Sequence, residues 1–183
     1  MTQDLKATVV FYTMENYPPE DSPYALLNKA LRAKDRESVK IWRHYVWLFL
    51  HALREIPASD VPVVVRGCKL SSTDPKLGDQ CTVGEECVWS AFSSTATTLD
   101  VMQQFCGDSG PRTLFQLELL PGIARSVKAF SLYPNENELV LPPNLEFEVV
   151  AKFDAGNDLT MVQLKQIEGD DAILDMRVLM ESE

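Results

Sequence analysis

Two acidic side chains, Glu136 and Glu138, stand one residue apart directly before the apolar run 139–143. In an extended segment, residues i and i+2 point to the same face, so both carboxylates would face one site roughly 6–7 Å apart. We expect their repulsion to raise the pKa of at least one of them, which is how a general acid or base is made. In isolation, the alternative is a solvated loop that carries two acids.

A cationic side chain that could bind a ligand stands earlier in the chain. The β-branched run 63–65 predicts a short buried strand, which we expect to end at Arg66 and to be followed by Gly67. The planar fork of an arginine suits phosphate, and a glycine lets the backbone approach a flat ring closely. The alternative for Arg66 alone is a salt bridge at the end of a strand.

Hydroxyl side chains follow one another at Ser93, Ser94 and Thr95, inside an expected strand over 89–95. Hydroxyl groups along a strand can hydrogen-bond a carboxylate or a ribose. Serine and threonine are also common on solvated strand faces, which is the alternative here.

The elements that must position these residues follow the order of an α+β protein. Helices are predicted at 24–32, where Ser22 and Pro23 form a start signal, and at 35–55, which Pro57 ends. A later helix is expected at 99–105, and a hairpin turn at 155–158. Strands are expected at 63–65, 89–95, 113–119, 127–130, 145–153, 159–166 and 172–179. We predict one domain over 1–183, with a helical part at about 22–56 and a β core at about 61–180.

Composition excludes several classes of function. The chain has 183 residues and a formal net charge of -10, which argues against a nucleic-acid binder and favours a basic protein partner. A phosphate site would therefore need a local cation. No signal peptide and no apolar run long enough to span a membrane is seen, so we expect a cytoplasmic protein that acts as a monomer.

A metal centre is not predicted. Cys68, Cys81, Cys87 and Cys106 lack CxxC spacing, and the two histidines, His44 and His51, share an expected helix. Thiols are the default state for these cysteines, with a disulfide framework as the alternative. The chain also lacks the glycine-rich phosphate-binding signatures, so any dinucleotide would bind outside a Rossmann site.

Taken in order, Arg66-Gly67, the Ser93-Ser94-Thr95 run and the Glu136–Glu138 segment resemble the R–S–E signature of the arginine-directed mono-ADP-ribosyltransferases. This family includes clostridial-type toxins and animal ectoenzymes. The resemblance covers about residues 24–150, and each motif is weak whereas the ordered set is strong. The sequence departs from the family at Ala96, where a second serine is often found, which removes one supporting hydrogen bond.

The resemblance implies an α+β fold of the ADP-ribosyltransferase type, with a helical part packed on a two-sheet β core. It implies NAD as substrate and a protein with an accessible arginine as partner. Glu138 would stabilise the positive charge that develops on the ribose, as in glycoside hydrolysis. Ser94 would orient Glu138 and the ribose, Arg66 would hold the NAD phosphate, and Phe105 would cover the nicotinamide ring.

The resemblance also gives Glu136 a role of its own, which is to attract and deprotonate or polarise the arginine acceptor. Two alternatives stay open. An NAD glycohydrolase would use the same Glu138 with water as acceptor, and a catalytically silent domain of this fold would only bind a partner.

Overall fold

The four α-helices whose bounds the structure describes precede the strands, an order that is consistent with an α+β protein. The structure, a computed structural model, describes residues 1–98, 106–107 and 109–169. Within them the helical elements are α1 (Gln3–Tyr12), η1 (Pro19–Asp21), α2 (Pro23–Arg32), α3 (Glu37–Lys40), α4 (Arg43–Glu55), η2 (Gly78–Cys81) and η3 (Pro134–Glu136). The strands are β1 (Val63–Cys68), β2 (Glu86–Trp89), β3 (Ser93–Thr95), β4 (Arg112–Glu118), β5 (Arg125–Ser126), β6 (Leu139–Leu141), β7 (Leu145–Gly156) and β8 (Leu159–Ile167).

The helical part begins earlier than predicted. Helix α1 lies before the expected boundary at residue 22. It was not predicted, because apolar residues occur on both of its faces and give no clear helical period. Helix α2 confirms the predicted helix, although the Ser22 hydroxyl accepts from the Asn16 N–H over 2.9 Å instead of capping α2. The single helix predicted over 35–55 is divided into α3 and α4. The chain tightens there, since the Trp42 N–H donates to the carbonyl of Val39, three residues back, over 2.9 Å.

Two sheets form the β core. The larger has the strand order β1-β4-β8-β7-β2, in which β4 and β8 are parallel and the other neighbours antiparallel. The smaller has the antiparallel order β3-β6-β5. The strand predicted over 89–95 is in fact β2 and β3, which belong to different sheets. The prediction of one strand was wrong because residues 90–92 carry the chain from one sheet to the other.

Other predicted strands had mixed outcomes. Strands β4, β7 and β8 confirm three of them, and the hairpin turn lies at Asn157 and Asp158, both with positive φ. The strand predicted over 127–130 is wrong. The paired residues come just before it, in β5, and the N–H groups of Phe130 and Ser131 both donate to the Val127 carbonyl in a turn. The helix predicted at 99–105 and the strand predicted at 172–179 lie outside the described residues.

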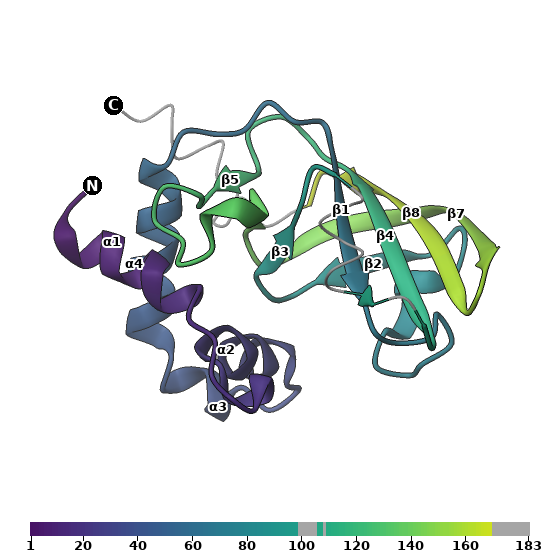
Figure 1. Cartoon of the computed structure of the whole chain (residues 1–183), viewed down its shortest axis with the longest axis horizontal. Helices are drawn as coiled ribbons and strands as arrows, with labels where there is room; N and C mark the ends of the chain where they lie inside the picture. Colours follow the sequence, from purple (N-terminus) through teal and green to yellow (C-terminus); the bar gives the residue numbers. More distant parts are fainter. Residues whose placement is uncertain (99–105, 108, 170–183) are drawn as a thin grey trace.

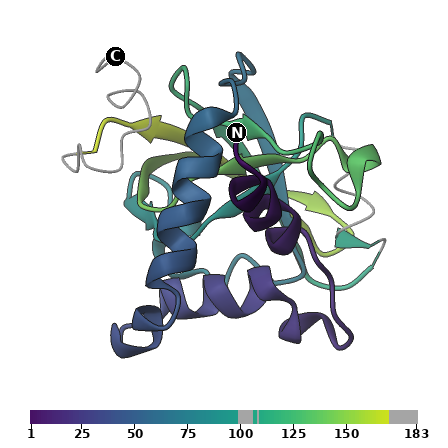
Figure 2. The ribbon, with the colours of Figure 1, turned by 90° about the vertical axis from the view of Figure 1, so that its left-hand side faces the viewer.

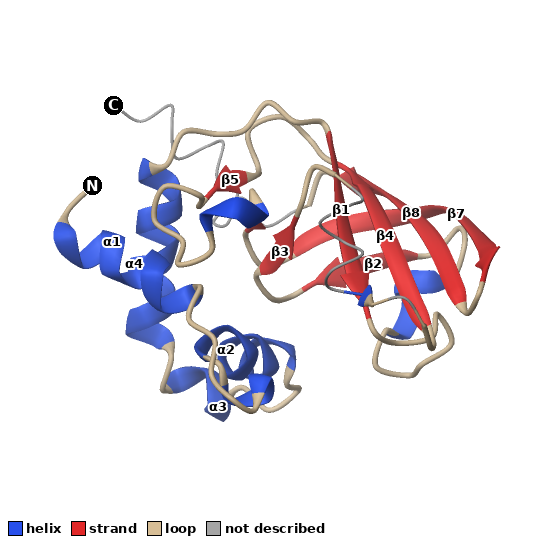
Figure 3. Cartoon of the chain, viewed as in Figure 1, coloured by secondary structure: helices blue, strands red, loops and turns tan. Residues whose placement is uncertain are grey.

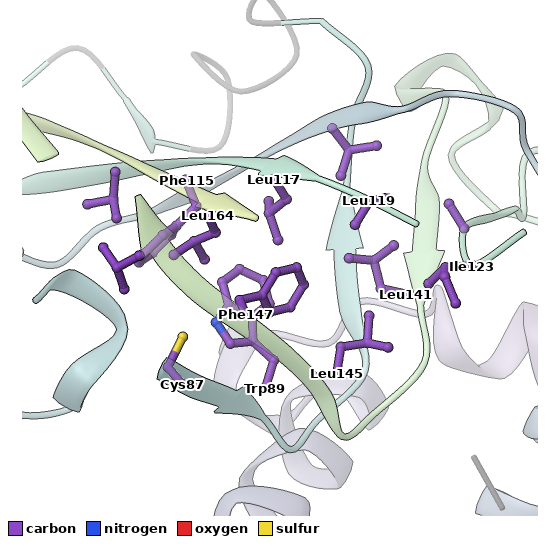
Figure 4. Close-up of a cluster of buried hydrophobic side chains, with 14 of the residues drawn as sticks. Cys87, Trp89, Phe115, Leu117, Leu119, Ile123, Leu141, Leu145, Phe147 and Leu164 are labelled. Carbon is purple, nitrogen blue, oxygen red and sulfur yellow. The ribbon is translucent and has the colours of Figure 1, made fainter. Parts of the chain in front are cut away.

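The smaller sheet is the middle layer of the molecule. Figures 1 and 3 show the α-helices on one side, β3 and β5 next to them and the larger sheet beyond. Figure 2 faces the helices, with α1, α2 and α4 in front of the strands. Strand β6 is buried on both faces, because Leu139 and Leu141 join the core shared with the larger sheet whereas Val140 joins the core under the helices. Figure 4 shows Leu141 in the first of these cores, near Phe147 and Leu145.

Cys68, Cys81, Cys87 and Cys106 are thiols and not half-cystines. In the part of the chain that the structure describes, no helix is long and apolar enough to cross a membrane. The described residues also contain no group of three or more His, Cys, Asp or Glu side chains placed to hold a metal ion.

The position of β6 between two cores predicts a strong effect of truncation. Leu141 is 0% exposed, so Leu141→Ala leaves a cavity that should lower the free energy of unfolding by about 2–5 kcal/mol. Leu26→Ala is the matched control, since Leu26 is 41% exposed on α2, and it should change stability by less than about 1 kcal/mol. Urea unfolding followed by tryptophan fluorescence measures both, and equal effects would contradict the central position of β6.

Candidate active site

Arg66 and Ser94 are brought together where strand β1 meets the end of β3. Val65 and Ala96 form an antiparallel bridge between the two sheets. The Val65 N–H donates to the Ala96 carbonyl over 2.8 Å, and the Ala96 N–H donates back over 2.9 Å. Arg66, the next residue, donates from Nη1 to the carbonyl oxygen of Ser94 over 2.8 Å. Two backbone bonds and one side-chain bond thus fix the guanidinium beside the serine.

The sequence predicted that the strand ends at Arg66, and this was wrong. Strand β1 continues to Cys68, which lies opposite Thr113 of β4, because the pairing with β4 extends past the β-branched run. Arg66 and Gly67 are therefore held within a hydrogen-bonded sheet, and both line a pocket. A side chain on a paired strand is placed more rigidly than one on a loop, which suits a binding group.

The hydroxyl run Ser93-Ser94-Thr95 divides its side chains between the interior and the pocket. Ser93 and Thr95 are buried, and the Thr95 hydroxyl donates to the Leu139 carbonyl over 2.8 Å. Ser94 is half-buried and lines the pocket. It lies opposite Val140 of β6, so strand pairing holds it close to Glu138, two residues before Val140.

Glu136 and Glu138 also line this pocket, but not through an extended segment. Glu136 ends the 3₁₀ turn η3, and Asn137 has left-handed backbone angles, φ 48° and ψ 41°. The prediction of a common extended face was wrong because the chain turns between the two acids. Asparagine tolerates the left-handed region better than most residues, and the Lys128 Nζ donates to the Asn137 Oδ1 over 2.7 Å. The turn still directs both carboxylates to one pocket.

The two carboxyl groups both have raised pKa values, and the nearby groups that contribute to the shift differ between them. Burial is the largest cause for both. For Glu138, a hydrogen bond with the Ser94 side chain and the charge of Arg66 lower the pKa in opposition to burial. For Glu136, the charges of Glu138 and Glu15 add to the effect of burial. The predicted repulsion therefore raises the pKa of Glu136, but the loss of water around its carboxyl group raises it more.

The pocket has a volume of about 240 Å³, and a large part of its wall comes from the N-terminal segment. Tyr12 and Asn28 are the innermost of these residues, with 1% and 5% of their surfaces exposed. The Tyr12 hydroxyl lies 3.5 Å from the Ser94 Oγ, and the Asn28 Nδ2 donates to the Tyr12 hydroxyl over 3.4 Å. The N-terminal residues on the wall are Tyr12, Thr13, Glu15, Tyr24 and Asn28.

Sequence reasoning missed all of these N-terminal residues. One signal was present for Asn28, which is a polar residue on the apolar face of a predicted helix beside Leu27 and Leu31. Its Oδ1 atom is buried and accepts no hydrogen bond from the described residues. Arg32, one turn further along α2, has a pKa lowered by burial and then by the charge of Arg66, so the two guanidinium groups lie near each other. Phe105, the predicted nicotinamide cover, lies outside the described residues.

Comparison with known proteins gives this arrangement its family. A family model described as NAD:arginine ADP-ribosyltransferase matches residues 2–171, which is most of the chain. The chain belongs to this family. It is accordingly an NAD-dependent ADP-ribosyltransferase that uses NAD as its substrate. The sequence matches none of the curated proteins with which it was compared.

Solved structures confirm the ADP-ribosyltransferase fold. Vis, a toxin from Vibrio splendidus whose structure was solved in complex with agmatine, is 22% identical, with a TM-score of 0.71 over 93% of this chain and 77% of Vis. The C3 exoenzyme of Clostridium limosum is 14% identical, with a TM-score of 0.68 over 92% of this chain and 87% of C3. HopU1 of Pseudomonas syringae pv. tomato DC3000 is 20% identical, with a TM-score of 0.68 over 89% of this chain and 76% of HopU1.

From its contacts with Ser94 and Asn28, we predict that the Tyr12 hydroxyl supports the position of Ser94 in this ADP-ribosyltransferase. Tyr12→Phe removes the contacts to Ser94 and Asn28 while the ring keeps its stacking on Phe49, at a centroid distance of 4.6 Å. We expect stability to fall by about 1 kcal/mol and NAD cleavage to fall about 3- to 10-fold. Chemical unfolding and a nicotinamide-release assay measure the two effects. Tyr45→Phe is the matched control, and wild-type NAD cleavage in Tyr12→Phe would contradict the role.

The raised pKa of Glu138 predicts how stability depends on pH. The folded protein binds this proton more tightly than the unfolded chain, so the stabilisation is complete below the ordinary carboxyl pKa. It is lost as the pH rises through the raised folded-state pKa. Glutamine stays neutral at every pH, so Glu138→Gln should gain stability relative to the wild type as the pH rises above the ordinary carboxyl pKa of about 4. Urea midpoints of both proteins, measured at pH values on both sides of the ordinary carboxyl pKa, test this. A difference in midpoint that does not depend on pH would contradict the raised pKa of Glu138.

Proposed function

We propose that this enzyme transfers ADP-ribose from NAD to an arginine side chain of a protein and releases nicotinamide. The observation that carries the proposal is the convergence of Arg66, Ser94, Glu136 and Glu138 on one pocket. These residues come from three separate parts of the chain. They supply a cation, a hydroxyl group and two carboxylates, which are the groups that the two half-reactions require.

The pocket offers partners for NAD. Arg66 provides the local cation that a diphosphate needs on an acidic protein, with Arg32 nearby. Asn28 has a buried Oδ1 without a partner among the described residues, which a ligand N–H or O–H group would satisfy. Gly67 would let the flat nicotinamide ring lie close to β1, and Phe105 remains the residue proposed to cover that ring.

Glu138 is the residue we propose to act on the ribose. The bond between ribose C1′ and the nicotinamide nitrogen breaks, and its electron pair leaves with neutral nicotinamide. The ribose then carries oxocarbenium-like positive charge, which a nearby carboxylate stabilises. The Ser94 side chain and Arg66 both lower the pKa of Glu138 and so favour its ionised form. Preorganised charge of this kind commonly contributes about 10²–10³ in rate.

Glu136 is the residue we propose to act on the acceptor. A guanidinium is cationic and weakly nucleophilic, so it must lose a proton as its nitrogen bonds to ribose C1′. The pKa of Glu136 is raised by burial and by Glu138, which makes its carboxylate a better proton acceptor. Vis, which shares the fold, was solved with agmatine, a small guanidinium compound, and this supports an arginine-type acceptor here.

The division of labour between the two acids is testable by separate replacement. Glu138→Gln should lower both nicotinamide release and transfer by about 10²–10³-fold, since both reactions pass through the same charged ribose. Glu136→Gln should keep NAD hydrolysis while losing transfer to agmatine. Incubation with NAD labelled in the adenine ring, with and without agmatine, separates free ADP-ribose from ADP-ribosyl-agmatine.

The same assay decides between the candidate functions. Labelled ADP-ribose without any labelled agmatine in the wild type would identify an NAD glycohydrolase. Absence of NAD turnover, with no heat of NAD binding by calorimetry, would identify a silent binding domain. Equal loss of hydrolysis and transfer in Glu136→Gln would contradict the separate role of that residue.

A further inference from the structure

A third carboxylate, Glu15, lines the same pocket and has no part in the scheme above. It follows α1, far in sequence from the other two acids. Its charge raises the pKa of both Glu136 and Glu138. Arg66, by contrast, acts on Glu138, whereas the charges acting on Glu136 are those of Glu138 and Glu15. Glu15 therefore lines one pocket with both of the other acids, and Arg66 is not among the charges that act on Glu136.

The backbone on both sides of Glu15 is fixed. Two residues earlier, the Thr13 hydroxyl accepts from the Leu132 N–H over 3.2 Å, which ties this segment to the loop before η3. One residue later, the Asn16 N–H donates to the Ser22 hydroxyl over 2.9 Å, and the Asn16 Nδ2 donates to the Asp21 carbonyl over 2.8 Å. The backbone segment that carries Glu15 is thus tied to the loop before η3, and the Glu15 side chain is exposed.

The negative charge of this wall is not balanced within the described part of the protein. The pocket lining includes three carboxylates, from Glu15, Glu136 and Glu138, and Arg66 is the only cationic residue among the described lining residues. Glu15 forms no ion pair with any described residue. In the same lining, the buried Oδ1 of Asn28 has no hydrogen-bond partner among the described residues, which indicates that this pocket takes a polar ligand. A substrate with negative charge would pair with Arg66, and the carboxylates would then be available to bind a cation.

We propose that Glu15 binds the guanidinium of the acceptor together with Glu136 and so determines the specificity for arginine. This inference rests on the proposed function. A guanidinium has five N–H donors along separate edges, so two carboxylates can bind it at once. Glu15 would hold one edge as an ion pair, and Glu136 would take the proton from the nitrogen that bonds to ribose C1′. Glu15 is a binding residue in this scheme and transfers no proton.

The test is the neutral variant Glu15→Gln, assayed with agmatine as acceptor and NAD as donor. Loss of one charge-assisted contact should raise the KM for agmatine about 5- to 10-fold, with a much smaller change in kcat. The KM for NAD should change by less than about twofold, because NAD does not use this carboxylate. The salt dependence of the KM for agmatine should also weaken, since one attractive charge is gone. Glu15→Asp, which keeps the charge, should recover part of the affinity.

Glu20→Gln is the matched control, because Glu20 is an exposed acid on η1 that does not line the pocket. It removes the same charge from the same segment and should leave the KM for agmatine at the wild-type value. An unchanged KM in Glu15→Gln, or an equal rise in Glu20→Gln, would overturn the role of Glu15 while leaving arginine transfer intact. A wild-type enzyme that transfers nothing to agmatine would overturn the proposed function and this inference together.

Discussion

The pair of backbone hydrogen bonds between Val65 and Ala96 is the constraint on which the site depends. They join the edge strand of the larger sheet to the end of the smaller one, at 2.8 and 2.9 Å. Arg66 and Ser94 meet only because of this junction, and the pairing of Ser94 with Val140 then holds Glu138 close by. Because the smaller sheet is buried between two cores, a shift of β6 would require repacking on both faces. The geometry of the candidate site therefore depends on the packing of both cores.

The site holds a partly buried carboxylate under opposing influences. Burial favours the protonated form of Glu138, whereas the Ser94 side chain and Arg66 favour the charged form that the proposed chemistry needs. The pKa remains raised, so the balance does not fully offset the loss of water. Enzymes commonly tolerate such local instability because a preorganised charge cannot be supplied by solvent at the moment of reaction. The well-packed β6, directly after Glu138, provides the rigidity to hold it.

Sequence reasoning reached the residues of the three motifs better than the strands and turns that carry them. Arg66, Ser94 and the two acids each stand beside an apolar run, and it was the resemblance of their order to a family signature that united them. The left-handed Asn137 was not foreseen, since an extended and a turned Glu136–Glu138 segment have the same hydrophobic pattern. Helix α1 was missed for a related reason: both of its faces are rich in apolar residues, so periodicity gives no signal. The contacts of Tyr12 span 82 residues to Ser94, a separation that local patterns do not encode.

Charge explains why the N-terminal segment belongs to the site and is more than a structural cover. A protein with a net charge of -10 attracts basic partners and repels the diphosphate of NAD over the same distances. Arg66 and Arg32 lie near each other, and we propose that Glu15 acts with Glu136 on the acceptor. The Debye length is about 8 Å at physiological salt, so each substrate responds mainly to the charges within about that distance of it. In this proposal, the segment after α1 adds to the pocket an acid that the β core alone would lack.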